Sequence, residues 1–448
     1  MTKPTKKKNL RASAPPCETK STAVKTLVPK LRFPEFRGAG NWTTETLGSM
    51  AKISTEKVGN KTCVPMSITS GVGLVSQMEK FGRIIAGSSY ANYLLLKKND
   101  FAYNKSATKE YPEGFIALYS GEDLAAVPNS IFTCFRITGD SPYPLYLNYL
   151  LLGNLHGKWL RNFIEVGARA HGSLSVDEDD LLALPVPVPS GKTSLPEQRK
   201  IAECLSSVDD LIAAQAGKVD ALKTHKKGLM QQLFPREGET QPRLRFPEFQ
   251  NAGEWEEKRL DELVVIQSGA TPSKAIPAFW NGSIPWVSAK DMKRLFLEDA
   301  EDHISAAAVD NGARLVPPGT LLVLTRGMTL LKDVPICILR REMSFNQDVK
   351  GLRPKDGADG LFLAWMLIGN KERLLAMVNI AGHGTGKLDT EELKALELMV
   401  PSPAEQHRIA SCLSSLDGLI TAEGQKLEGL KTHKRGLMQQ LFPSAVEA

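Results

Sequence analysis

Two stretches of the chain carry apolar residues at alternating spacings of four and three. In residues 197–233 only Gln215 and Lys226 interrupt the apolar stripe, and in the second stretch only Glu423 and Lys434 interrupt it. The stripe positions are Ile201, Leu205, Val208, Ile212, Val219, Leu222, Leu229 and Leu233, and then Ile409, Leu413, Leu416, Ile420, Leu427, Leu430, Leu437 and Leu441. A 3.5-residue period over five heptads is typical of a coiled-coil seam. Each helix would span ~55 Å at ~1.5 Å per residue, more than one small domain covers. We therefore expect the two helices to pair with each other; the alternative is that each packs separately on its own domain.

The two stretches are copies of one sequence. Residues 195–235 recur as residues 403–443, with 26 of 41 positions identical and a constant offset of 208. Shorter matches lie outside the helices: KLRFPEFRGAGNWTTETLGSM at 30–50 with RLRFPEFQNAGEWEEKRLDEL at 243–263, YLNYLLLGN at 146–154 with FLAWMLIGN at 362–370, and HGSLSVDEDDLLAL at 171–184 with HGTGKLDTEELKAL at 383–396. The chain is therefore a tandem duplication.

Between these matched segments the two halves differ strongly in sequence. Residues 51–140 and 264–355 both contain short apolar runs bounded by turn residues, which predicts strands with a few helices. The predicted fold is α+β, with two pseudo-symmetric globular domains joined by two long helices that form an antiparallel coiled coil. The expected segments are a disordered basic tail at 1–29, a first domain at 30–194, a first helix at 195–235, a linker at 236–242, a second domain at 243–402, a second helix at 403–443 and a tail at 444–448.

The polar interruptions of the stripe predict a register for the two helices. If Lys226 faces Glu423, then Gln215 faces Lys434, and the other layers, such as Leu222 against Leu427, are apolar. Buried polar residues that meet in this way specify the register of a coiled coil. We therefore predict the pairs Lys226–Glu423 and Gln215–Lys434.

Composition narrows the class of protein. Hydrophobic residues make up 42% of the chain and charged residues 24%, as in globular proteins. No apolar run approaches the ~18–20 residues of a membrane span, and no apolar stretch follows the N-terminal lysines as it would in a secretory signal. The six cysteines form no CxxC pair. We expect a cytoplasmic protein that does not bind a membrane.

The net charge of +6 arises from the N-terminus. Residues 1–30 contain eight Lys or Arg residues and one Glu, so the rest of the chain has a net charge of −1. If that remainder binds nucleic acid, it must use local basic clusters. The tail either adds non-specific attraction for phosphates or is a solvated extension.

Motifs of catalysis are missing from the sequence. AGHGTGK at 381–387 departs from a phosphate-binding loop, because Ala381 stands at the first position and Leu388 follows Lys387. The sequence contains no Asn/Asp-Pro-Pro-aromatic loop of an adenine methyltransferase, no HExxH or GxSxG, and no His/Cys cluster with metal-ligand spacing. Glu256 and Lys258 resemble half of a nuclease motif, but we expect them on a charged surface helix. The chain is therefore predicted to lack enzymatic activity and to hold no metal.

The repeated motifs together resemble one family. The LRFPEF…W…L segments, the divergent domains and the twin EQ…I…LSS…D…KTHK…GLMQQLFP helices resemble the specificity subunits of type I restriction-modification systems. Within the domains, YNKSATKEYPEGFIALY at 103–119, IPWVSAKDM at 284–292 and FNQDVKGLRP at 345–354 are similar to the target recognition domains of that family. The resemblance covers nearly all of residues 30–443.

The resemblance implies a non-catalytic subunit that reads a split, asymmetric target in double-stranded DNA. Each domain would read one half-site, and the paired helices would set the distance between them. Two modification subunits would methylate adenines with S-adenosylmethionine, and two restriction subunits would add Mg-dependent cleavage and ATP-driven translocation, so all cofactors would lie on partner subunits. The alternative is a stand-alone DNA-binding repressor or architectural protein.

Basic and amide side chains in loops are the candidates for DNA contact. Arg and Asn can read base edges through paired hydrogen bonds, while Lys mostly holds phosphate. The His-Gly loops that begin at His171 and His383 either approach DNA closely or are structural turns. The candidates are Asn104, Lys105, Lys109, Arg136, Arg169 and His171 in the first domain, and Lys290, Lys293, Arg326, Arg353, His383 and Lys387 in the second.

Overall fold

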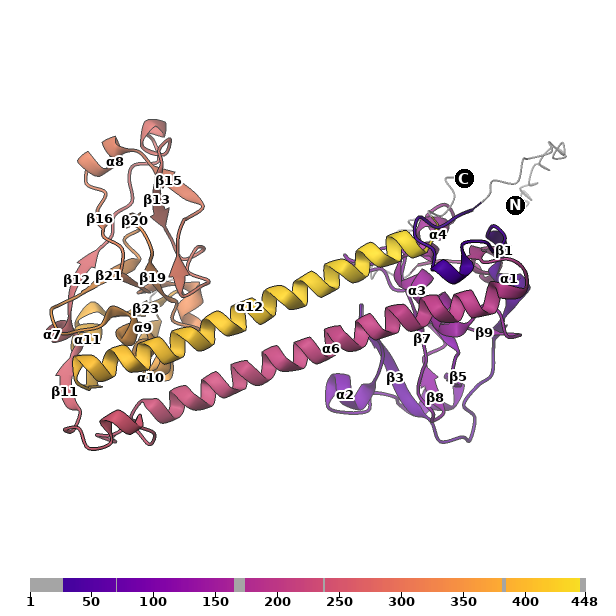
Figure 1. Cartoon of the computed structure of the whole chain (residues 1–448), viewed down its shortest axis with the longest axis horizontal. Helices are drawn as coiled ribbons and strands as arrows, with labels where there is room; N and C mark the ends of the chain where they lie inside the picture. Colours follow the sequence, from indigo (N-terminus) through magenta and orange to yellow (C-terminus); the bar gives the residue numbers. More distant parts are fainter. Residues whose placement is uncertain (1–26, 70, 165–173, 237, 381–383, 444–448) are drawn as a thin grey trace, which may run out of the picture. The chain divides into compact units, whose positions relative to one another are not determined.

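The computed structural model describes residues 27–69, 71–164, 174–236, 238–380 and 384–443 (Figure 1). The chain forms two compact units. Unit 1 combines residues 1–213 with residues 428–448, and unit 2 consists of residues 214–427. The division falls within both long helices, so each unit contains one globular domain and part of each helix. Nearly all of both predicted tails lies outside the described residues.

Two long helices follow the globular domains, as predicted. Helix α6 covers Ser194–Leu233 and helix α12 covers Pro403–Leu441. The apolar stripe is the buried face of each helix: Leu205 and Leu413 are fully buried, Val219 is buried, and most of the other stripe positions near the middle of the helices are half-buried. Partial burial is expected where a helix contacts only one other helix.

The helices run antiparallel, but the predicted register is wrong. In unit 2 the Gln215 side chain donates to a Glu423 carboxylate oxygen at 2.6 Å, and Lys226 is paired with Asp417. In unit 1 Lys434 is paired with Asp209 at 2.6 Å. Residues later in α6 thus pair with residues earlier in α12, as antiparallel helices require. Lys226 therefore does not face Glu423, and Gln215 does not face Lys434. Each lysine instead pairs with an aspartate, Asp417 or Asp209, that directly follows a stripe position.

The first domain contains two four-stranded sheets. One has the order β2-β9-β6-β7 and the other the order β4-β3-β8-β5, with β3 and β8 parallel. The strands are β2 (Ala51–Ser54), β3 (Val64–Thr69), β4 (Gly73–Ser76), β5 (Leu94–Leu96), β6 (Phe101–Asn104), β7 (Phe115–Leu118), β8 (Ala125–Val127) and β9 (Phe132–Ile137), and helix α2 (Gln77–Phe81) follows β4.

The second domain repeats the topology of these two sheets with one strand added to the first of them. Its sheets have the orders β12-β21-β17-β19-β14 and β15-β13-β20-β16, with β13 and β20 parallel. The strands are β12 (Val264–Ser268), β13 (Ile284–Val287), β14 (Phe296–Leu297), β15 (Asp302–Ile304), β16 (Leu315–Val316), β17 (Leu321–Leu324), β19 (Ile336–Leu339), β20 (Met343–Phe345) and β21 (Val349–Pro354), and helix α8 (Ala306–Asp310) follows β15. Strands β6 and β17 are therefore equivalent, as are β9 and β21, although their sequences differ.

The segments matched by sequence, together with the elements that directly follow them, form a common frame around each domain. In the first domain the frame consists of β1 (Thr43–Thr46), α1 (Leu47–Met50), α3 (Pro144–Leu152), α4 (Leu155–Leu160), α5 (Glu178–Leu182) and β10 (Pro185–Val188). In the second it consists of β11 (Glu256–Arg259), α7 (Leu260–Leu263), α9 (Gly360–Gly369), α10 (Lys371–Ala376), α11 (Thr390–Lys394) and β24 (Glu397–Val400). Strands β1 and β10 pair antiparallel, and so do β11 and β24.

Strand β11 corrects one expectation. Glu256 and Lys258 lie on this strand, where a surface helix was predicted. The charged run EEKR is tolerated there because Glu256, Glu257 and Arg259 are exposed in a sheet of only two strands.

A buried ion pair ties each leading motif to the start of its long helix. Arg32 donates two hydrogen bonds to the Glu197 carboxylate, at 2.8 and 2.7 Å, and Glu197 is fully buried. In unit 2 Arg245 makes the same two bonds to Glu405 at the same distances. The repeated LRFPEF and EQ motifs are therefore the two sides of one contact.

Each domain is also closed by the end of the other repeat's helix. Leu441 and Phe442 join the core of the first domain together with Tyr146, whereas Leu233 and Phe234 join the core of the second domain together with Phe362. The helices thus pair with each other and also pack on the domains, so the two alternatives from the sequence are both partly correct. None of the described helices has the length and apolar character of a membrane-spanning segment.

Candidate nucleic-acid interface

Predicted contact residues of both domains gather at the same end of equivalent strands. Asn104 is the last residue of β6, and Lys105 follows it. In the second domain Arg326 lies two residues beyond the end of β17 and begins the short strand β18 (Arg326–Gly327). Because β6 and β17 are topologically equivalent, the structure places unrelated side chains near the same strand end in the two domains.

A small sheet brings two candidates of the second domain together. Strand β23 (Gly386–Leu388) lies between β18 and β22 (Val378–Ile380), and Arg326 is directly opposite Lys387. The Arg326 side chain is exposed. Lys387 is 44% exposed and forms an ion pair with Asp389 at 3.0 Å. His383 belongs to the connection between β22 and β23 and lies outside the described residues.

Lys350 extends this basic cluster and was not predicted. Its ammonium donates to Ser268 Oγ at 2.6 Å. Partial burial lowers the pKa of Lys350, and the positive charges of Arg326 and Lys394 contribute in the same direction, although Asp348 opposes them. Cations held this close repel one another, and a polyanion would relieve the repulsion. Lys350 was missed because it lies within a strand, whereas the candidates were sought in loops.

The first-domain candidates lie on a connection that hydrogen bonds hold in place. The Asn104 side-chain oxygen accepts from the Ser106 amide at 3.1 Å, and the Lys105 carbonyl accepts from the Leu174 amide at 2.7 Å. Lys109 is exposed farther along the same connection between β6 and β7. Gly114 ends it at a φ of 81°, where a Cβ atom would lie 2.4 Å from the Asn104 carbonyl oxygen. Arg169 and His171 lie outside the described residues.

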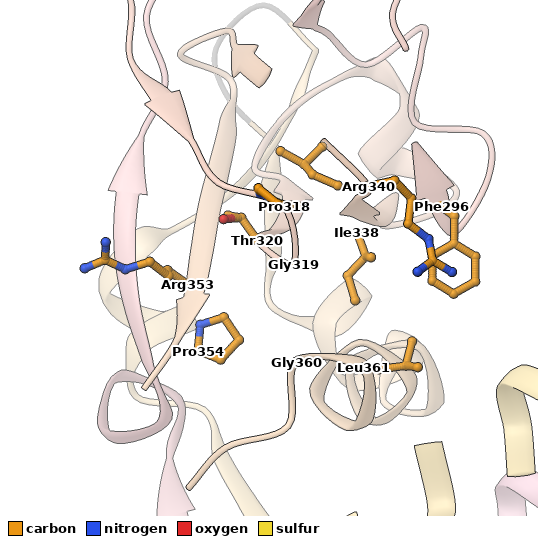
Figure 2. A pocket seen from close by; sticks show the side chains of 11 residues that line it. Phe296, Pro318, Gly319, Thr320, Ile338, Arg340, Arg353, Pro354, Gly360 and Leu361 are labelled. Carbon is orange, nitrogen blue, oxygen red and sulfur yellow. The ribbon is translucent and has the colours of Figure 1, made fainter. Parts of the chain in front are cut away.

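Two candidate arginines lie at the opposite end of these sheets. Arg136 is the fifth residue of β9 and Arg353 the fifth of β21, so they occupy equivalent positions. Arg136 donates to the buried carboxylate of Asp100 at 2.6 and 2.7 Å. Arg353 lies beside a cavity of about 500 Å³ and points away from it (Figure 2). On the other side of this cavity the Arg340 guanidinium lies 3.9 Å from the centre of the Phe296 ring. Neither Arg136 nor Arg353 joins the predicted contact residues, so we omit both from the interface.

The two candidate lysines after β13 line a different surface. Lys290 is paired with Glu301 at 3.1 Å and with Asp302 at 2.9 Å, and these carboxylates raise its pKa. Lys293 is exposed on the same connection. Both line a groove that also includes Trp365 and Thr421, beside the long helices. Within the described residues no group of three or more His, Cys, Asp or Glu side chains could hold a metal ion.

Comparisons with known proteins point to one family. A family model described as the type I restriction modification DNA specificity domain matches residues 252–432. The specificity subunit of the Escherichia coli type I restriction enzyme EcoR124I/EcoR124II is 29% identical over 242 residues, which cover 53% of this chain and 56% of that protein. The MjaIX specificity subunit of Methanocaldococcus jannaschii is 30% identical over 194 residues, which cover 42% of this chain and 44% of that protein. The match thus spans about half the length of these relatives.

A solved structure shares the fold over nearly the whole chain. The S subunit of a type I restriction-modification system from M. genitalium superposes with a TM-score of 0.55 at 15% identity, covering 94% of this chain and 100% of that one.

Proposed function

We infer that this chain, which is similar to type I restriction-modification specificity subunits, belongs to that family, and we propose that it recognises a bipartite, asymmetric target in double-stranded DNA. Each domain reads one half-site through the side chains at the ends of β6 and β17. The paired helices α6 and α12 set the number of unspecified base pairs between the half-sites. The protein itself performs no chemistry.

One observation supports this proposal above the others. The two domains share a topology, yet they present Asn104 and Lys105 at one strand end and Arg326 at its equivalent. Asn pairs with adenine and Arg with guanine in the major groove, so different side chains near the same strand end favour different bases. Two domains that share a fold but carry different contact residues are suited to an asymmetric target.

We also propose the partners that the chemistry requires. Two modification subunits would bring S-adenosylmethionine, and two restriction subunits would bring ATP and Mg²⁺. The chain would then serve as their common adapter on DNA.

Methylation mapping tests the proposed function. A host that carries this protein with its modification subunit is sequenced by a method that detects N6-methyladenine. We expect methylation within a single split target, and replacement of residues 51–185 by the domain of a relative should change only one half-site. Methylation without a consistent split target would contradict the proposal, and full DNA affinity of the isolated chain would favour a stand-alone binder.

Arg326→Ala is expected to weaken DNA binding by ~1–3 kcal/mol if Arg326 reads a guanine, and to relax specificity at that base. Lys350→Ala should instead weaken binding to all sequences. The slope of log affinity against log salt concentration should also become smaller by about one. Arg353→Ala, on the same strand as Lys350 but at its far end, is the matched control and should leave binding unchanged. Fluorescence anisotropy at several salt concentrations measures all three, and equal effects of Arg326→Ala and Arg353→Ala would contradict the assignment.

A further inference from the structure

A lysine of the first long helix lies between an aromatic ring and an aspartate in unit 2. The Lys226 ammonium lies 4.1 Å from the centre of the Trp365 ring and is paired with Asp417. The Trp365 indole is almost fully buried and donates to Ser414 Oγ at 2.9 Å. Trp365 belongs to the recognition domain, whereas Asp417 and Ser414 belong to α12.

The same arrangement recurs in unit 1 with a different aromatic residue. The Lys434 ammonium lies 5.2 Å from the Tyr149 ring and 2.6 Å from Asp209 Oδ1. The Tyr149 hydroxyl donates to the other oxygen of Asp209 at 2.8 Å. Burial and this carboxylate raise the pKa of Tyr149, so the hydroxyl stays protonated and remains a donor.

Both sets occupy equivalent positions of the duplication. Lys226 and Lys434 are separated by the helix offset of 208, and so are Asp209 and Asp417, while Tyr149 and Trp365 match in the short-helix segment. Each set joins three segments: the short helix of the domain, the long helix of the same repeat, and the long helix of the other repeat. We call each set a lysine bridge.

The lysine bridges add directional contacts to an otherwise apolar part of each core. The apolar contacts of Leu233, Phe234 and Trp255 depend mainly on buried area and tolerate small rotations of a domain. A cation that must satisfy both a ring face and one carboxylate does not tolerate them. Lys226 and Lys434 are only 17% and 18% exposed, whereas Asp417 and Asp209 are 28% and 40% exposed, so water reaches the carboxylates more readily than the lysines.

We propose that Lys226 and Lys434 are positioning residues, which fix the orientation of each recognition domain on the helix pair and so narrow the range of spacer lengths that the protein accepts. The part concerning spacers rests on the proposed function. The part concerning orientation does not.

Hydrogen exchange of the full-length protein tests the orientation. Lys226→Met keeps the length and apolar stem of the side chain but removes its charge. We expect amide protection in residues 360–369 and 409–421 to fall about tenfold, since a desolvated cation–ring contact contributes on this order. Lys226→Arg should keep wild-type protection, and Lys227→Met, an exposed neighbour, serves as the control. Unchanged protection in Lys226→Met would overturn the proposal.

A spacer library tests the consequence for DNA recognition. The wild-type and the Lys226→Met/Lys434→Met proteins, each with the modification subunit, methylate plasmids in which the two half-sites are separated by every spacer length in a short range. The wild type should prefer one length, and the double variant should also methylate neighbouring lengths severalfold more than the wild type does. If exchange becomes faster but methylation depends on spacer length as in the wild type, the lysines have only a structural role, and the proposal is overturned. If even the wild type methylates no split target, the proposed function fails, and the orientation is decided by the exchange data.

Discussion

Arg245→Ala is expected to destabilise unit 2 by about 3–5 kcal/mol, because it leaves a buried carboxylate without its cation. Glu405 is 1% exposed, and Arg245 satisfies it with two hydrogen bonds while also donating to the carbonyls of Ala252 and Gly253. The variant therefore loses the contact that joins the leading motif to the start of α12. Urea unfolding followed by the fluorescence of Trp255 and its neighbours measures the loss.

Arg408→Ala provides a matched control. Arg408 forms an ion pair with Glu248 at 2.8 Å in the same region, but both side chains are 47% exposed. Exposed pairs contribute roughly 0–1 kcal/mol, so this variant should unfold almost like the wild type. The variant Arg245→Met/Glu405→Leu should recover much of the lost stability, because apolar pairs often replace buried ion pairs at little cost. Similar losses in Arg245→Ala and Arg408→Ala would refute the burial argument.

The sequence was sufficient to predict the helices but not their register. A 3.5-residue stripe identifies which face of a helix is buried, and this face is the same in the structure. It does not identify the residues at the margin of that face. Asp209 and Asp417 each follow a stripe position by one residue, and their carboxylates reach the lysines across the seam. Gln215 then pairs with Glu423, its own equivalent in the other repeat.

The common topology of the two domains was not visible in the sequence. Phe101 and Tyr103 fill the core around β6, whereas Leu321 and Val323 do so around β17. A core tolerates such exchanges when its volume and pattern are preserved, so strand order persists after sequence similarity is lost. Only the hydrogen-bonded strand order establishes the equivalence.

The sequence indicates which cations are exposed in turn-rich segments, but not which of them are already paired in the fold. Arg326 and Lys387 fall in turn-rich segments, where an exposed cation is easily recognised, and the structure places them opposite each other. Arg136 was chosen by the same criterion, but its guanidinium forms an ion pair with Asp100, which precedes it by 36 residues. Pairing between distant segments is a property of the fold, and residue type alone does not reveal it.

Lengthening both long helices by one heptad is expected to lengthen the preferred DNA spacer by about three base pairs. Seven residues that continue the apolar stripe are inserted after Gly217 in α6 and after Gln425 in α12. These positions are equivalent in the two repeats and lie close to the Gln215–Glu423 pair, so the added segments meet each other. Each insertion adds ~10 Å of helix at ~1.5 Å per residue, and three base pairs add a similar rise at ~3.4 Å each.

The insertion should change distance without changing base choice. Three base pairs also rotate one half-site by roughly 100° relative to the other, given 10–10.5 base pairs per turn, so overall affinity should fall even at the new preferred spacer. The half-site sequences should remain those of the wild type, because Asn104 and Arg326 lie in the domains and not on the helices. Insertion into α6 alone should abolish binding, since it removes the seam partners of every residue beyond it. Methylation of a spacer library measures all of these outcomes, and an altered half-site sequence in the doubly lengthened protein would show that the helices do not act as a spacer alone.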